Sequence, residues 1–180
     1  MNTYVVAKKE ERIYAKTSFS SFRLQPVEYS GTSSNGLYQI NSLTFIDKDN
    51  RTLPITDIKE ESTNKATFVL DGKITGTVTY NSSVYGDSNG VGKILKTSGW
   101  FYPTQLNTLT DKPSIEFTFS NIIPRLSKIT WNPYNASSKI LKINFLADLE
   151  LLDIDTTTKN EINFNYLPSI LDLYKNRPVR

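Results

Sequence analysis

The side chains best suited to binding another molecule occur near the middle of the chain, beside its longest glycine-bearing loop. That loop covers residues 81–92 and is followed closely by Trp100 and Tyr102. A sugar ring has an apolar C–H face and a rim of hydroxyl groups, so flat aromatic faces beside amide and carboxylate groups suit carbohydrate recognition. The candidate glycan-binding residues are therefore Tyr85, Asp87, Asn89, Trp100 and Tyr102.

A second interpretation of Trp100 stays open, because tryptophan side chains are highly buried on average. On that interpretation Trp100 belongs to the hydrophobic core, and Tyr85 and Tyr102 are the better candidates for a surface role. The two interpretations differ in whether the Trp100 ring is accessible to a ligand.

Most catalytic chemistry is excluded by composition, because the chain contains no cysteine and no histidine. Thiol nucleophiles, imidazole general bases and most transition-metal sites need one of these residues. The acidic pairs Glu60/Glu61 and Asp153/Asp155 have no spacing that specifies a shared cleft for glycoside hydrolysis. Gly90-Val91-Gly92-Lys93 lacks the flanking strand and helix of a phosphate-binding loop. We therefore expect a protein that is not an enzyme and needs no cofactor.

Oxygen ligands suited to calcium occur in one short segment. Asp47, Asp49 and Asn50 stand at positions i, i+2 and i+3, and carboxylate and amide oxygens are typical calcium ligands. The remaining acidic ligands of an EF-hand loop are absent, and a polar hairpin turn explains the same residues. We predict a turn here and no metal.

Apolar and polar residues alternate in several short segments, as in half-buried β-strands. In the clearest of them, Ile115, Phe117 and Phe119 alternate with Glu116 and Thr118. Apolar residues make up 38% of the chain, charged residues 22% and aromatic residues 12%. This composition favours strands over helices in an ordinary soluble domain.

Turn and bulge signals separate these segments. Asp71-Gly72 lies between two alternating runs and predicts a hairpin with positive φ at both central residues. In residues 37–46 the apolar positions shift after Ile40, as a β-bulge would cause. Pro26, within residues 13–29, indicates an edge strand or a bulge.

About eight strands at short spacings, with no long helical period, predict an all-β protein with a two-sheet antiparallel jelly-roll sandwich. We place this domain at residues 1–155. Residues 156–180 form a C-terminal extension with a short helix candidate at 169–175, behind Pro168. The extension is too apolar for a free tail, so it packs either on the sandwich or on a neighbouring subunit.

The order of these segments resembles the galactose-binding-domain-like, or discoidin-type, jelly roll found in carbohydrate-binding modules, lectin-like appendages and many bacteriophage virion proteins. The resemblance covers about Tyr14 to Asp153. It implies that ligands are held by loops at one end of the sandwich, and Trp100 is the residue that matches a family position. The segments that carry it are Ser18–Leu24, Leu43–Asn50, Thr97–Trp100, Ser114–Phe119, Ile129–Pro133 and Lys139–Ile143.

Charge and hydropathy narrow the class of partner. The net charge of +3 comes from scattered residues, so no basic stripe for nucleic acid is present. The sequence contains no run of about 18 consecutive apolar residues, so we expect no membrane insertion. The N-terminus lacks the pattern of a secretory signal. We expect synthesis in a bacterial cytoplasm and assembly into a virion.

These observations predict a non-enzymatic structural or adhesion subunit of a phage-like virion, such as a capsid-decorating, fibre or tail-associated protein. Its partners are other virion proteins or copies of itself. The alternative is a carbohydrate-binding module that recognises a cell-surface glycan.

Overall fold

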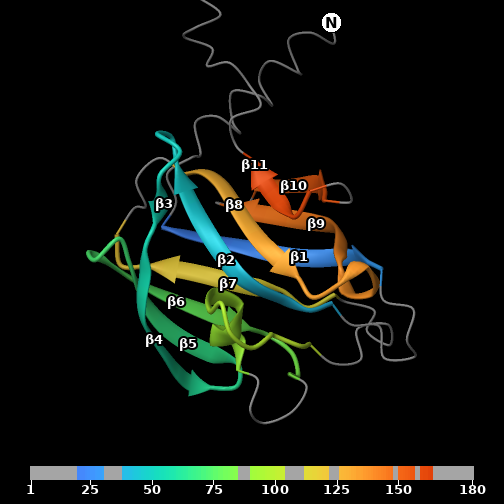
Figure 1. The fold of residues 1–180 in the computed structure, drawn as a ribbon, viewed down its shortest axis with the longest axis horizontal. Helices are drawn as coiled ribbons and strands as arrows, with labels where there is room; N and C mark the ends of the chain where they lie inside the picture. The colour runs from blue at the N-terminus through green and yellow to red at the C-terminus, as the bar shows by residue number, and fades with distance from the viewer. Residues whose placement is uncertain are drawn as a thin grey trace, which may run out of the picture.

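The computed structural model describes residues 20–30, 38–84, 90–103, 112–121, 126–147, 150–156 and 159–163 of the chain. Its strands form two antiparallel sheets that pack against each other (Figure 1). This confirms the predicted all-β, two-sheet antiparallel sandwich. The helix candidate at 169–175 lies outside the described residues.

The larger sheet has seven strands in the order β10-β9-β1-β7-β6-β5-β4. Near its centre the sheet joins distant parts of the chain, because the early strand β1 lies between the later strands β7 and β9. The strands of this sheet are β1 (Ser21–Tyr29), β4 (Ile55–Ser62), β5 (Lys65–Leu70), β6 (Ile74–Tyr80), β7 (Ile115–Phe119), β9 (Ile140–Ala147) and β10 (Glu150–Asp155).

The smaller sheet has four strands in the order β11-β8-β2-β3. The short 3-10 helices η1 (Val91–Leu95) and η3 (Ala136–Ser138) lie in the connections. The strands of this sheet are β2 (Ile40–Asp47), β3 (Thr52–Leu53), β8 (Leu126–Pro133) and β11 (Glu161–Asn163).

The predicted hairpin joins β5 to β6. Asp71 and Gly72 have φ values of 53° and 67°, and the Lys73 N–H donates to the Leu70 carbonyl at 3.2 Å. Positive φ at both central residues is the conformation that a type I′ turn requires.

Both predicted strand irregularities are also present as bulges. In β2 the register shifts between Asn41 and Thr44, and Ser42 between them has a φ of 51°. In β1 the register with β9 shifts between Pro26 and Glu28. The bulge interpretation of Pro26 is therefore confirmed, whereas the edge-strand interpretation is wrong, because β1 lies inside the sheet.

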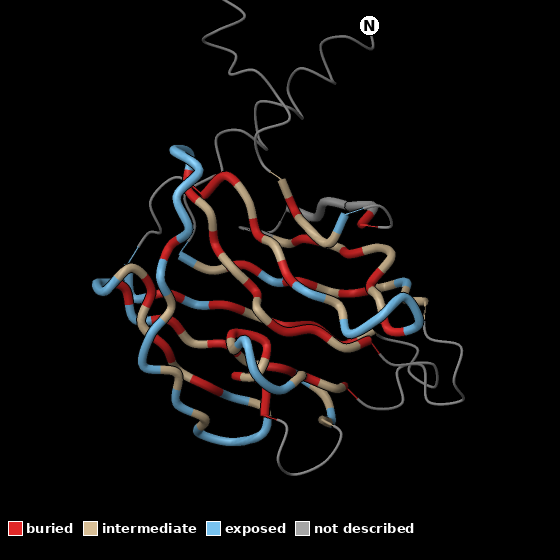
Figure 2. Tube along the Cα trace, in the orientation of Figure 1, coloured by how far each residue is buried: buried red, intermediate tan, exposed pale blue. Residues whose placement is uncertain are grey.

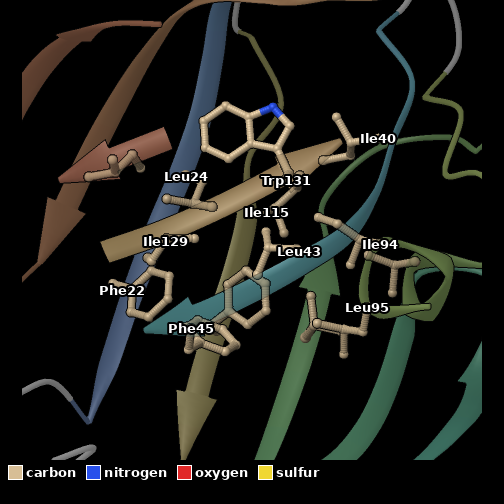
Figure 3. Close-up of a cluster of buried hydrophobic side chains, with 14 of the residues drawn as sticks. Phe22, Leu24, Ile40, Leu43, Phe45, Ile94, Leu95, Ile115, Ile129 and Trp131 are labelled. Atoms are coloured by element: carbon tan, nitrogen blue, oxygen red, sulfur yellow. The ribbon is translucent and has the colours of Figure 1, made fainter. Parts of the chain in front are cut away.

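The core lies between the two sheets and is rich in phenylalanine. The Phe22 and Phe117 rings stack with centroids 5.1 Å apart, and Phe45 meets Phe117 edge to face at 5.7 Å. Figure 3 shows Trp131 of β8 turned into the same interior, and this side chain is only 4% exposed. The alternation predicted for β7 is confirmed, because Ile115, Phe117 and Phe119 are buried.

The smaller sheet is too narrow to cover all of the larger one, and η1 covers part of the remainder. This helix contacts β2, β4, β5 and β6. Its Val91, Ile94 and Leu95 side chains are buried, and Figure 3 shows Ile94 and Leu95 beside the core residues of β2. The chain that leaves η1 therefore starts from a fixed position on the sandwich.

The first part of the predicted C-terminal extension belongs to the sandwich. β11 pairs with β8, and Ile162 within it is 1% exposed. Thr156 is buried as well, and its hydroxyl donates to the Ile140 carbonyl at 3.0 Å. Residues 164–180 lie outside the part of the chain that the structure describes.

Candidate functional site

The segment after η1 is held against the start of β2 by backbone hydrogen bonds. The Ser42 N–H donates to the Lys96 carbonyl at 2.9 Å, and the Phe101 N–H donates to the Ile40 carbonyl at 3.0 Å. Successive side chains of an extended chain point to opposite sides. Phe101 is fully buried, so Trp100 and Tyr102 on either side of it face away from the core and are partly exposed.

A third aromatic residue joins this segment from β8. Tyr134 follows the end of β8 and is 54% exposed, the only large hydrophobic side chain of the described residues that is exposed. Its ring lies 5.2 Å from that of Trp100, edge to face at 82°. Burial, together with the nearby Tyr134 hydroxyl, raises the pKa of Tyr102. We refer to Trp100, Tyr102 and Tyr134 as the aromatic surface.

The turn that carries Tyr134 is well supported. The Tyr134 N–H donates to the Gln39 carbonyl at 3.2 Å. Asn135 caps η3, because its side-chain oxygen accepts hydrogen bonds from the Ser137 N–H at 2.8 Å and the Ser138 hydroxyl at 3.1 Å. An Asn at a helix N-cap satisfies backbone donors that would otherwise be unpaired. Tyr134 is thus presented by a fixed turn.

The structure brings together part of the candidate site predicted from sequence. Trp100 and Tyr102 lie on one surface, and the core interpretation of Trp100 is wrong, because Trp100 is only partly buried and is not part of the core cluster that contains Trp131. Tyr85, Asp87 and Asn89 lie outside the described residues. Sequence reasoning missed Tyr134, whose only signal was an aromatic residue inside the polar turn that follows β8.

The acidic segment after β2 forms the predicted turn. The Asn50 N–H donates to the Asp47 carbonyl at 3.0 Å. One Asp47 carboxylate oxygen accepts from the Asp49 and Arg51 N–H groups, each at 2.9 Å. The other accepts from the Arg51 guanidinium at 3.1 Å. The Arg51 backbone N–H is the main cause that lowers the pKa of Asp47.

The acidic pair Glu60/Glu61 does not converge on a common space. The Glu60 carboxylate accepts a hydrogen bond from the Gly92 N–H at 3.2 Å. Glu61 pairs with Lys65 at 2.8 Å. No cluster of three or more acidic side chains that could hold a metal ion occurs in the described part of the chain.

Within the described ranges, no helix is long and apolar enough to span a membrane. Comparison with protein-family models, curated proteins and solved structures found no match. The fold and the side chains therefore define a β-sandwich with an exposed aromatic surface at the junction of β2, β8 and the segment after η1.

Proposed function

We propose that this protein is a non-enzymatic adhesion module of a phage-like virion, and that its aromatic surface binds a cell-surface glycan. The observation that carries the proposal is the grouping of Tyr134, which is 54% exposed, with the partly exposed Trp100 and Tyr102. Exposed apolar side chains that are grouped rather than scattered usually mark a binding surface. The virion context is supported by the Asn/Ile/Lys/Ser-rich composition and the sandwich fold.

The ring geometry favours a small saccharide over a flat polymer surface. Trp100 and Tyr134 are nearly perpendicular, at 82°, so the two rings cannot form one flat platform. A single sugar ring can stack on one exposed face, and Asn132, which is exposed two residues before Tyr134, offers polar atoms for its hydroxyl groups. A contact of this size corresponds to a Kd on the order of 1 mM, or about −4 kcal/mol.

The test is glycan binding by the full chain, first on an array and then by titration with the saccharides that bind. We expect Trp100→Ala, Tyr102→Ala and Tyr134→Ala to weaken binding at least about tenfold, equivalent to about 1.4 kcal/mol. Thr118→Ala is the control, because Thr118 is exposed on β7 of the other sheet. It should bind as the wild type does.

Two outcomes would contradict the proposal. One is the absence of any glycan signal for folded wild-type protein on the array and in titration. The other is unchanged affinity in Tyr134→Ala with the fold intact. Tyrosine and tryptophan are also enriched at protein interfaces, so variants that lose particle incorporation without any glycan effect would assign the surface to subunit contact.

A purely structural role is the second candidate, and one observation favours it. β11 anchors the start of the C-terminal segment in the smaller sheet through Ile162. The sequence that follows is rich in apolar residues at positions 164–174. An apolar segment tethered at a sheet edge is suited to subunit contact, where interfaces bury on the order of 800 Å² per partner.

A further inference from the structure

We propose that Asn41 is a positioning residue for the aromatic surface, and that it acts by holding the loop that presents Trp100. Asn41 does not itself belong to the aromatic surface. The proposal rests on the proposed function only where ligand binding is measured, because the loop position has a spectroscopic readout of its own.

The contact is a double hydrogen bond from one side chain. The Asn41 Nδ2 donates to the carbonyls of Thr97 and Gly99, each at 3.2 Å. These carbonyls lie on either side of Ser98, and Gly99 has a φ of 78° immediately before Trp100. One amide group therefore fixes both ends of the turn from which Trp100 projects.

The β2 bulge places Asn41 under that loop. Ile40 and Asn41 are adjacent and both buried, at 2% and 3% exposure, although neighbouring strand residues face opposite sides. Ile40 faces the core. Asn41 is buried on the other side, where the loop covers it, and the Ser42 N–H bonds to Lys96 at the start of the same segment at 2.9 Å.

The two hydrogen bonds fix the orientation of the Asn41 amide. Carbonyl oxygens accept hydrogen bonds, so the NH₂ group must face Thr97 and Gly99. The Asn41 Oδ1 is then buried, and it has no hydrogen-bond partner among the described residues. A half-satisfied buried amide is a poor stabiliser compared with an apolar group of the same shape. We therefore infer that the Asn41 side chain serves to fix the position of the loop rather than to stabilise the fold.

The experiment uses the full chain with Trp131→Phe as the parent, because the chain has two tryptophans and Trp100 then becomes the only one. Asn41→Leu keeps the branched shape and the number of side-chain heavy atoms, with a somewhat larger volume, and removes the hydrogen bonds. Asn41→Asp places a carboxylate against two carbonyls. Thr44→Val is the matched control, because it removes a β2 side-chain hydrogen bond, to Thr130 at 2.6 Å, that does not involve the loop.

We expect Asn41→Leu to stay folded, with higher acrylamide quenching of Trp100 and a weaker near-ultraviolet circular dichroism band from the Trp100–Tyr134 pair. Asn41→Asp should change both signals further, and Thr44→Val should leave them at the parent values. Where the wild type binds a saccharide, Asn41→Leu should lose affinity about tenfold.

Parent-like quenching and circular dichroism in folded Asn41→Leu would overturn the proposal. If Asn41→Asp fails to fold, Asn41→Ser decides instead, because one hydroxyl can donate to only one of the two carbonyls and should give an intermediate signal. The wild type could bind no glycan while the Asn41 variants still change the Trp100 signals as expected. That result would contradict the proposed function and would still support Asn41 as the residue that positions the loop.

Discussion

The two tryptophans of this chain occupy opposite environments. Trp131 is 4% exposed between the sheets, whereas Trp100 is partly exposed beside Tyr134. Residue type does not distinguish them. The difference arises from which side of an extended segment each residue occupies, since Trp100 is the neighbour of fully buried Phe101 and must face the other way.

A glycine in β6 has a role that is equally local. Gly76 stands opposite Phe68 on β5, and a Cβ atom added there would overlap the Phe68 ring. Phe68 is buried and makes edge-to-face contacts with Phe117 and Phe119. We expect Gly76→Ala to lower the free energy of unfolding by about 1–3 kcal/mol, because a packed ring cannot move aside.

The measurement is chemical denaturation of Gly76→Ala alone and in a Phe68→Leu background. The smaller Leu side chain should accommodate the methyl group, so Gly76→Ala should cost less in that background. Equal losses in the two backgrounds would show that the ring is not the cause.

The turns at one end of the sandwich join its two sheets. Arg51 lies after β2 and bonds to Asp47 in the same turn. It also donates to both carboxylate oxygens of Asp71, at 2.8 and 3.1 Å, in the β5–β6 turn of the other sheet. The Asp71 N–H donates to the Pro54 carbonyl at 2.8 Å. This arrangement uses the carboxylates as structural acceptors.

The contacts of Arg51 with Asp47 and Asp71, which we call the Arg51 clamp, make the stability of the fold depend on pH. Hydrogen bonds lower the pKa values of Asp47 and Asp71 below their ordinary 3.8. A carboxyl whose pKa is lowered by folding stabilises the folded state above its unfolded pKa, and this contribution is lost as the pH falls through the folded pKa. Stability should therefore fall as the pH drops below about 4.

Denaturation midpoints at pH 7 and pH 3 test this. We expect Asp47→Asn to be less stable than the wild type at pH 7 and to differ from it less at pH 3. Asp49→Asn is the control, because the Asp49 side chain is 70% exposed and forms a salt bridge with its neighbour Lys48 rather than with Arg51. If the stability difference between the wild type and Asp47→Asn were the same at pH 7 and pH 3, the Arg51 clamp would not be the cause of the pH dependence.

The outer strand β4 is an element that the sequence pattern does not reveal. β4 was not expected, because its residues do not alternate. In the structure it is the outer strand of the larger sheet, with register shifts, a φ of 52° at Asp57 and mostly exposed or half-exposed residues (Figure 2). Charges and bulges on an edge strand oppose pairing with other chains, and these features remove the periodic signal.

At the scale of the whole molecule, each sheet combines strands from both halves of the chain. β1 lies between β7 and β9, and β2 lies beside β8. Neither sheet can form from one half of the chain alone. β11 completes the smaller sheet, so a truncation that tests the C-terminal segment must leave Glu161–Asn163 in place.

Deletion of residues 164–180 therefore separates the two candidate functions. We expect the truncated protein to unfold with a midpoint close to that of the wild type and to keep glycan binding, because Ile162 and the aromatic surface are retained. Incorporation into particles should fall if the segment contacts other subunits. Unchanged incorporation would rule out an anchoring role for it, and loss of stability would show that it packs on its own sandwich.

Local pattern determined a large part of this protein. Period-two apolar runs, Asp71-Gly72 and the shift after Ile40 depend only on backbone geometry within a few residues, so the sandwich, its hairpin and its bulge were predictable. Trp100 and Tyr102 were identifiable from residue type, as aromatic side chains that follow a glycine-bearing loop. Tertiary structure alone decided that Tyr134 meets Trp100 and that Asn41 lies beneath their loop. Those contacts depend on which distant strands pair, and periodicity carries no information about partners far along the chain.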